Sequence, residues 1–491
     1  MTKVAKVLDS DDIIVNADAK IDADRLLIGG KGASLFWMSS LGLPGPPFFV
    51  LSTRAWREWR EAGQLSELHV AKVMEMIRWL EGRTGRTFGG DPRPLLVSVR
   101  SAGPVSMPGM MDTILNLGLT PDALAALSRE FGSLQVVADV IMNFVGTATP
   151  VFVGNQDAVG MSFPLIPASA EDQLLGAIEG VFASWNNQRA RLYRRINRIP
   201  DDYGTAVVVQ AMVFGNAGDS SGTGVLFTRD PVSGDSLMRG EWVPAAQGEV
   251  IVSGRATPVP IEALRTAQPA IYQQLHDVAS QLERGAREPQ DIEFTVERGR
   301  LYLLQTRALK SAPLASCKTA LDFLDEGLIS QQEAIERLSL LELPELATDT
   351  FTEPPAAGAL LATGLAACPG IAHGVVVREI DAKGEAAAGR QSLVLLRPET
   401  TPHDLPVMRR ASALITEHGG LTSHAAIVAR ELKIPCVVGC GELGTVREGQ
   451  EVTVDGTAGA VYLGRLTVIR VVPEVVLRAQ SLLGSRASGA G

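Results

Sequence analysis

Residues 416–439 read TEHGGLTSHAAIVARELKIPCVVG. The apolar residues before this stretch predict a strand, and the glycine pair predicts a turn. AAIVAREL then predicts a helix that Thr422 or Ser423 can cap. His424 falls in the first helical turn, where the positive end of the helix dipole favours a neutral, nucleophilic imidazole and an anionic group attached to it. The letters T-S-H alone more often mark a polar helix start, so a reactive His424 needs support from other parts of the chain.

A second segment joins an apolar strand to a loop, at PLLVSVRS (94–101) and the Gly- and Met-rich residues that follow it. The guanidinium of Arg100 can form paired hydrogen bonds with phosphate oxygens. The loop that follows can turn backbone N–H groups toward a polyphosphate. Taken by itself, a structural arginine beside a flexible loop is the better explanation.

A third segment reads as a β-hairpin, with DIEFTVE followed by LYLLQTR. Alternation along the first strand puts Asp291 and Glu293 on one face, where they can share Mg²⁺. A two-residue turn at Arg298–Gly299 pairs Asp291 with Thr306, whereas a three-residue turn pairs Asp291 with Gln305. We expect the three-residue turn. An edge hairpin with solvated acids is the alternative.

Two glycine-rich stretches are weaker signals. GGKG (29–32) comes before a helical stretch and lacks the spacing of a P-loop. QAMVFGNAGDSSGTGVLFTRD (210–230) reads as a strand, a glycine loop and a second strand.

Together these segments resemble the pyruvate phosphate dikinase and phosphoenolpyruvate synthase family, over roughly residues 20 to 470. The phosphohistidine domain of that family contains a Gly-Gly-x-Thr-Ser-His-Ala-Ala run, which residues 419–426 match. Further matches around this run are Cys368–Gly370, Arg397–Pro402 and Ile434–Gly439.

The segment around Arg100 resembles the dikinases more than the synthases. One difference is that the dikinases have a Ser-Gly-Ala-Arg run within this motif, whereas residues Ser101–Val105 contain no arginine.

The resemblance implies an α/β chain of several domains (α+β in arrangement). Residues 1–310 would form an ATP-grasp nucleotide-binding domain and residues 311–363 a helical segment and linker. Residues 364–470 would form a swivelling β/β/α phosphohistidine domain, and residues 471–491 a C-terminal tail.

The resemblance also implies roles for individual residues. His424 would receive the phosphoryl group, with Thr422 beside it as a catalytic or regulated residue, although a helix cap is the simpler role for Thr422. Asp291 and Glu293 would hold Mg²⁺, and Arg100 and Arg307 would neutralise phosphate charge. Nucleotide contacts are implied for Lys31, Arg100, Gln210, Gln305 and Arg307, and for a lid formed by Ser221, Gly222, Thr223 and Gly224.

The implied reaction is a dikinase-type transfer of the ATP β-phosphoryl group to His424 through a pyrophosphoryl-histidine. AMP would leave, and phosphate or water would take the γ-phosphoryl group. Because the family's (β/α)₈ barrel needs about 250 residues, we expect a separate protein to bind the final acceptor, by family default pyruvate or phosphoenolpyruvate. Two alternatives stay open: a self-contained phosphotransferase for another small molecule in a biosynthetic pathway, and a non-catalytic nucleotide-binding regulatory protein.

Composition excludes some other classes. The 491 residues contain 45 Lys and Arg against 55 Asp and Glu, a formal net charge of -10, which argues against a nucleic-acid-binding protein. The four cysteines are too few and too scattered for a zinc site and fit reduced thiols. No signal-peptide pattern and no run of about 18 uncharged apolar residues stands out. We therefore expect a cytoplasmic protein without a membrane or nucleic-acid partner.

Overall fold

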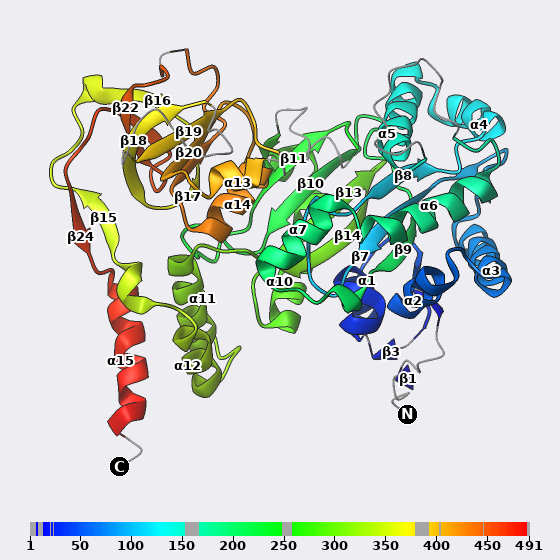
Figure 1. The fold of residues 1–491 in the computed structure, drawn as a ribbon, viewed down its shortest axis with the longest axis horizontal. Coiled ribbons are helices and arrows are strands. Elements are labelled where there is room, and N and C mark those ends of the chain that lie inside the picture. The colour runs from blue at the N-terminus through cyan, green and yellow to red at the C-terminus, as the bar shows by residue number, and fades with distance from the viewer. Residues whose placement is uncertain are drawn as a thin grey trace. The chain divides into compact units, whose positions relative to one another are not determined.

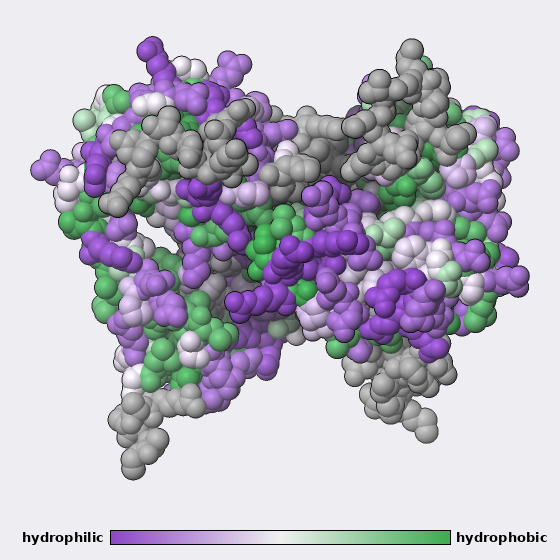
Figure 2. All heavy atoms as spheres, viewed as in Figure 1, coloured by the Kyte–Doolittle hydropathy of each residue, from purple (hydrophilic) through white to green (hydrophobic). Residues whose placement is uncertain are grey.

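The computed structural model describes residues 6–7, 13–19, 21–22, 24–152, 166–247, 258–378, 392–401, 404–444 and 446–488. The chain divides into two compact units, Met1–Gly222 with Phe294–Arg307 and Thr223–Glu293 with Ala308–Gly491. Both units combine helices and sheets, which confirms the predicted α/β class (Figure 1). On the face drawn in Figure 2, hydrophilic residues predominate and apolar residues form scattered patches. The domain limits given above stay a prediction.

An antiparallel sheet in the order β2-β4-β9-β7-β8 forms the centre of the first unit. Every residue of its middle strand β9 is buried, which explains the continuous apolar sequence of that strand. The strands are β2 (Ile14–Asn16), β4 (Phe48–Leu51), β7 (Val97–Ala102), β8 (Thr113–Leu117) and β9 (Ala206–Ala211). The strand predicted at PLLVSVRS is confirmed as β7.

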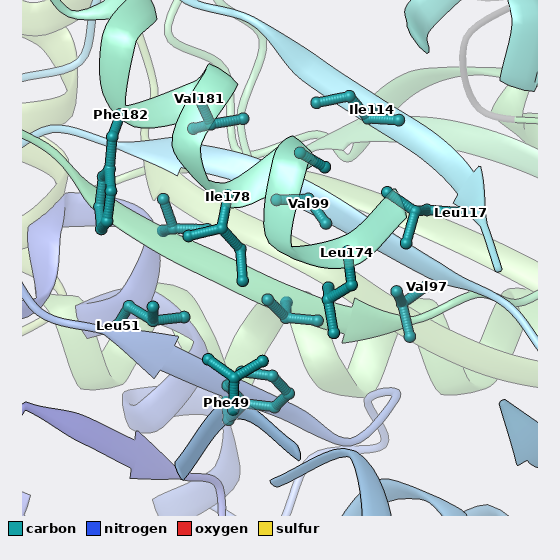
Figure 3. Packing of buried hydrophobic residues seen from close by; sticks show 14 of the residues in the cluster. Phe49, Leu51, Val97, Val99, Ile114, Leu117, Leu174, Ile178, Val181 and Phe182 are labelled. Atoms are coloured by element: carbon teal, nitrogen blue, oxygen red, sulfur yellow. The ribbon is translucent and has the colours of Figure 1, made fainter. Parts of the chain in front are cut away.

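Helix α6 (Ala170–Ser184) closes the main core over this sheet. Its Leu174, Ile178 and Val181 recur at helical spacing and are fully buried. Figure 3 shows them beside Val97 and Val99 of β7. One apolar helix stripe and one sheet face are therefore enough to close this layer.

The GGKG stretch lies inside a helix rather than before one. Helix α1 (Arg25–Ser40) is interrupted at Gly29, which has φ 71° and ψ 163°. A Cβ at Gly29 would lie 1.8 Å from the carbonyl oxygen of Ala102, so only glycine fits this close approach. The next amide, of Gly30, donates to the carbonyl of Gly103 at 2.9 Å. The turn was therefore predicted correctly, but the helix begins earlier than predicted.

Helices also dominate the described part of residues 121–200. The remaining helices of this unit are α2 (Thr53–Ala62), α3 (Glu67–Thr84), α4 (Pro121–Phe131), α5 (Leu134–Phe152) and α7 (Gln188–Asn197). Two short strand pairs accompany them: β1 (Lys6–Val7) with β3 (Ile21–Asp22), and β5 (Thr87–Phe88) with β6 (Pro94–Leu95).

Within the described residues, α5 is the one helix long and apolar enough to span a membrane by length and composition alone. It contains Asp139 and Pro150, and it lies against β8 and α6. Val140 and Phe144 are buried in two neighbouring apolar clusters of this unit. The helix therefore contributes to the packing of the first unit.

A second sheet has the order β12-β11-β10-β13-β14, and the division between the two units passes through it. Its strands are β10 (Gly222–Phe227), β11 (Arg239–Pro244), β12 (Val259–Pro260), β13 (Gln290–Glu297) and β14 (Arg300–Ala308). Helices α9 (Leu264–Ala267) and α10 (Pro269–Ala286) follow β12 and were not predicted.

The hairpin turn differs from the prediction. Strand β13 ends at Glu297 and β14 begins at Arg300, so only Arg298 and Gly299 form the turn. Both have positive φ, 50° and 77°, the conformation of a two-residue type I′ hairpin turn. The predicted three-residue turn is therefore wrong, and with it our reason for placing Gln305 on the same face as Asp291.

The predicted lid is also wrong. Gly222, Thr223 and Gly224 lie in β10, whose residues are all buried. The hydroxyl of Ser221 is buried and accepts a hydrogen bond from the amide of Arg298 at 2.9 Å. A buried interior strand has no freedom to open and close over a ligand.

A third sheet, of eight strands, has the order β16-β23-β22-β18-β19-β20-β21-β17. Its first and last strands are separated in the chain only by Gly364, so the chain passes directly from one edge strand of the sheet to the other. The strands are β16 (Leu360–Thr363), β17 (Leu365–Cys368), β18 (Ile371–Val377), β19 (Leu393–Arg397), β20 (Ala413–Thr416), β21 (Cys436–Val438), β22 (Glu451–Asp455) and β23 (Ala460–Leu463).

Alternation along these strands fills two cores. Val394 and Ile415 belong to one apolar cluster, whereas Leu395 and Leu414 face the other. Helix α14 (His424–Leu432) packs on the second cluster through its alanines, and α13 (Leu405–Met408) lies on the same side. This core fixes where the first turn of α14 lies.

The predicted linker and tail contain regular structure. Helices α11 (Pro313–Asp325) and α12 (Gln331–Ser339) confirm the predicted helical segment. Beyond them β15 (Thr348–Phe351) pairs with β24 (Val468–Val471). The expected tail forms helix α15 (Glu474–Ser488), which buries Val476 against α11 and α12. The predicted C-terminal tail, residues 471–491, therefore contains a helix.

Candidate functional site

His424 is the first residue of α14, as the sequence predicts. Ser423 is the N-cap, and its hydroxyl accepts from the amide of Ala426 at 3.4 Å. Thr422 is not the cap, because its hydroxyl donates to the carboxylate of Glu241 at 2.5 Å. The imidazole is half-buried rather than fully exposed, and it lies outside the apolar cores.

The side chain of Thr400 orients the imidazole. Its hydroxyl lies 3.0 Å from Nδ1 of His424. A partner at Nδ1 directs the other ring nitrogen, Nε2, to chemistry. Thr400 lies in the segment that resembles the family, but its role was not recognised from the sequence.

The pKa of His424 favours the nucleophilic form. Burial lowers this pKa below the ordinary value of 6.5, and the charge of Asp404 opposes the shift. Asp404 accepts hydrogen bonds from Arg397 at 2.6 Å and from the amide of Thr401 at 2.8 Å. Burial would raise the pKa of Asp404, but these bonds outweigh it and lower that pKa, so Asp404 stays ionised.

The loop before His424 is held by two charged side chains. Glu241 from β11 accepts from the amide of Leu421 at 2.7 Å as well as from Thr422. Arg430 donates to the carbonyls of Leu421, Ala367 and Lys310 at 3.0 to 3.1 Å. Neither side chain was predicted as functional, and nothing in the local sequence marks them.

Within the first unit, three of the predicted phosphate-binding residues have defined positions. Arg100 on β7 donates to Oε1 of Gln305 at 3.3 Å, so the structure brings these two predicted residues together. The ammonium of Lys31 donates to the carbonyl of Ser101, next to Arg100, at 3.0 Å. Arg307 is half-buried on β14, two residues from Gln305.

Gln210 occupies a more enclosed position than a ligand-binding residue needs. Its side chain is buried and donates to the carbonyl of Pro46 at 3.3 Å. This contact connects β9 to the chain that enters β4, which is a structural role.

The two predicted metal ligands both lie on β13, two residues apart. Asp291 is buried and Glu293 is half-buried. Carboxylate oxygens suit Mg²⁺, which usually takes one or two carboxylates and completes its shell with water and substrate phosphates. Among the described residues no group of three or more His, Cys, Asp or Glu side chains that could hold a metal ion occurs.

Two family models match this chain. The pyruvate phosphate dikinase AMP/ATP-binding domain matches residues 63–273, which include Arg100 and Glu241. The mobile domain of PEP-utilising enzymes matches residues 389–459, which include Thr400 and His424. The chain thus contains the nucleotide-binding and mobile domains that define a class of PEP-utilising phosphotransferases.

Within that class the chain is similar over most of its length to pyruvate, phosphate dikinases, in line with the predicted resemblance. It is 39% identical to "Pyruvate, phosphate dikinase" of Clostridium symbiosum over 90% of this chain and 56% of that protein. The protein of the same name from Rhizobium meliloti (strain 1021) is 38% identical over 92% and 57%. "Pyruvate, phosphate dikinase 2" of Zea mays is 39% identical over 89% and 56%.

The chain spans a little over half the length of these relatives. A solution structure of Enzyme I is also 34% identical over 20% of this chain and 38% of its own, with a TM-score of 0.13.

Proposed function

We propose that this chain uses ATP to phosphorylate His424 and that the phosphohistidine is the intermediate of a dikinase reaction. The observation that supports this most is the arrangement of His424 at the start of α14, with Thr400 on Nδ1 and a lowered pKa. A neutral imidazole with one nitrogen already occupied presents the other as a nucleophile.

In the first proposed step, Nε2 of His424 attacks the β-phosphorus of ATP. The bond from that phosphorus to the bridging oxygen of the α-phosphate breaks, and AMP leaves with the electron pair. In the second step an oxygen of inorganic phosphate attacks the γ-phosphorus, releasing pyrophosphate and leaving a phosphoryl group on His424. Water in place of phosphate would release phosphate instead.

The chain's cationic side chains would position the nucleotide and neutralise charge. Lys31, Arg100 and Arg307 are proposed to contact phosphate oxygens, because in-line phosphoryl transfer depends mainly on positioning and charge neutralisation. The Arg100–Gln305 contact supports this role, since it orients the guanidinium before any ligand binds.

Asp291 and Glu293 would hold Mg²⁺. When bound, the ion would neutralise negative charge on the phosphates. We propose that the final acceptor is pyruvate and that a separate protein binds it. We also propose a cytoplasmic location, which the four free cysteines support.

A labelling experiment tests the loading step. The purified protein is incubated with β-³²P-labelled ATP, Mg²⁺ and phosphate, and label on the protein is tested for stability in acid and alkali. We expect acid-labile, alkali-stable label that is lost in His424→Ala. His418→Ala is the matched control, because His418 is an exposed histidine six residues away and should keep the label.

Two further arms examine the metal ligands and the second acceptor. Asp291→Asn and Glu293→Gln should each lower the initial labelling rate by at least about 100-fold, whereas Glu288→Gln, an exposed acid nearby, should not. With γ-labelled ATP, label in pyrophosphate identifies phosphate as the second acceptor, and label in free phosphate identifies water. Label that survives His424→Ala, or no label on the wild type, would refute the proposal.

A further inference from the structure

The backbone N–H and C=O of Leu421, three residues before His424, are each hydrogen-bonded to a buried charged side chain. Glu241 is 6% exposed and accepts from the Leu421 amide. Arg430 is 4% exposed and donates to the Leu421 carbonyl. Hydrogen bonds to ionised groups are roughly twice as strong as neutral ones. The backbone at Leu421 is therefore held much more firmly than that of an ordinary surface loop.

The contact between Glu241 and the loop depends on a close steric fit. A Cβ at Gly420 would lie 1.8 Å from Oε1 of Glu241, so a larger residue there would displace the carboxylate. The side chain of Leu421 packs against the apolar cluster of Val225, Phe227 and Val243, on β10 and β11. An apolar contact and two hydrogen bonds thus join the loop of the eight-stranded domain to β11.

We propose that Glu241 is a positioning residue on which the phosphohistidine loop, residues 419–424, docks, and that this docking contact sets the position of His424 for loading. The role in loading rests on the function proposed above. Thr422, which donates to Glu241, is two residues before His424, the first residue of α14. A displacement of about 1 Å at a reacting group can lower a rate by roughly 100-fold.

Two other roles for Glu241 make different predictions. If Glu241 only stabilises the fold, its loss lowers stability without changing the loading rate of the folded protein. If it binds the nucleotide, its loss weakens ATP binding, and Gly420→Ala weakens it too, because the added methyl group displaces the carboxylate.

The first experiment measures docking without catalysis. Hydrogen exchange of a peptide covering residues 419–424 reports the amide of Leu421 in the protein without ATP. We expect Glu241→Ala to speed this exchange by at least about tenfold, because the amide loses its acceptor. Glu262→Ala, which removes a 44% exposed acid of the same region, is the control and should leave the exchange unchanged.

The second experiment measures loading. We expect Glu241→Ala to lower the rate of His424 labelling by about 10- to 100-fold at saturating ATP. The affinity for ATP, measured by equilibrium binding in a His424→Ala background, should stay within about twofold. Weaker ATP binding that accounts for the slower labelling would overturn the proposal, as would an unchanged labelling rate in Glu241→Ala.

The steric fit provides a compensating pair. Gly420→Ala should impair labelling and speed exchange as Glu241→Ala does, without affecting ATP affinity. Glu241→Asp shortens the side chain by one CH₂ and makes room for the new methyl group, so Glu241→Asp with Gly420→Ala should load faster than Gly420→Ala alone. The absence of this rescue, together with normal exchange in Gly420→Ala, would refute the docking contact. If Glu241→Ala speeds the exchange of the Leu421 amide but the wild type is never labelled, the docking contact stands and the proposed function is refuted.

Discussion

The hydroxyl of Thr400 lies 3.0 Å from Nδ1 of His424, although the two residues are 24 positions apart and on different elements. Thr400→Val keeps the shape of the side chain and removes this hydrogen bond. We expect the labelling rate of His424 to fall by about 10- to 100-fold, because the ring loses its fixed orientation. Thr400→Ser, which keeps a hydroxyl, should retain most of the rate. Equal rates in the valine and serine variants would show that the contact has no part in loading.

The lowered pKa of His424 predicts a pH dependence. Burial makes folded His424 hold its proton more weakly than an unfolded histidine, whose pKa is the ordinary 6.5. The labelling rate should therefore stay level as pH falls toward 6.5 and decline only below that value. The contribution of His424 to the free energy of unfolding depends on pH in the same direction. It is complete above the unfolded pKa and is lost as pH falls through the folded pKa.

A substitution at Asp404 tests the electrostatic contribution that opposes this lowering of the His424 pKa. Its charge raises the pKa of His424, so Asp404→Asn should move the midpoint of the histidine titration to still lower pH. The measurement is an NMR titration of the His424 ring, with exposed His276 as the internal reference. A midpoint that moves upward would contradict the electrostatic assignment.

Arg430 is expected to matter for stability. Its guanidinium donates to three backbone carbonyls, those of Lys310, Ala367 and Leu421. Because each buried carbonyl left without a donor costs about 1–3 kcal/mol, Arg430→Met should destabilise the eight-stranded domain by about 2–5 kcal/mol. Hydrogen exchange along α14 in increasing urea measures this loss. The exposed Arg409→Met should change it by less than about 0.5 kcal/mol.

Ile178 offers a test of the core of the first unit (Figure 3). It is fully buried on α6, and truncation leaves a cavity between the helix and the sheet. Ile178→Ala should therefore lower the free energy of unfolding by about 2–5 kcal/mol, measured by urea titration of tryptophan fluorescence. Leu192→Ala, at a side chain that is 49% exposed, should have a much smaller effect. Equal losses in the two variants would mean that α6 does not seal this core.

Much of the fold was predictable because local signals agreed with burial. The strand at PLLVSVRS and the helix after Ser423 are both present as predicted. Predictions were wrong where tertiary packing decided the outcome. The resemblance placed Gly222 and Thr223 at a lid, yet they form the start of the interior strand β10. Residues 474–488 have the composition of a tail, yet burial of Val476 against α11 and α12 makes them a helix.

The hairpin turn shows how little can separate two outcomes. Both a two-residue and a three-residue turn are compatible with Gly299, and only the positive φ of Arg298 decides between them. A non-glycine residue accepts that conformation at a cost of about 1 kcal/mol, which the pairing of the flanking strands offsets.

The amino-acid sequence by itself determined the resemblance to the dikinases, through its motifs, and the position of His424 at the start of a helix, because capping and apolar periodicity act over a few neighbouring residues. Only the tertiary structure placed Thr400 on Nδ1 of His424 and Glu241 on the backbone of Leu421. These partners are 24 and 180 residues distant in the chain, and hydrogen bonds between such distant groups depend on how the sheets and helices pack.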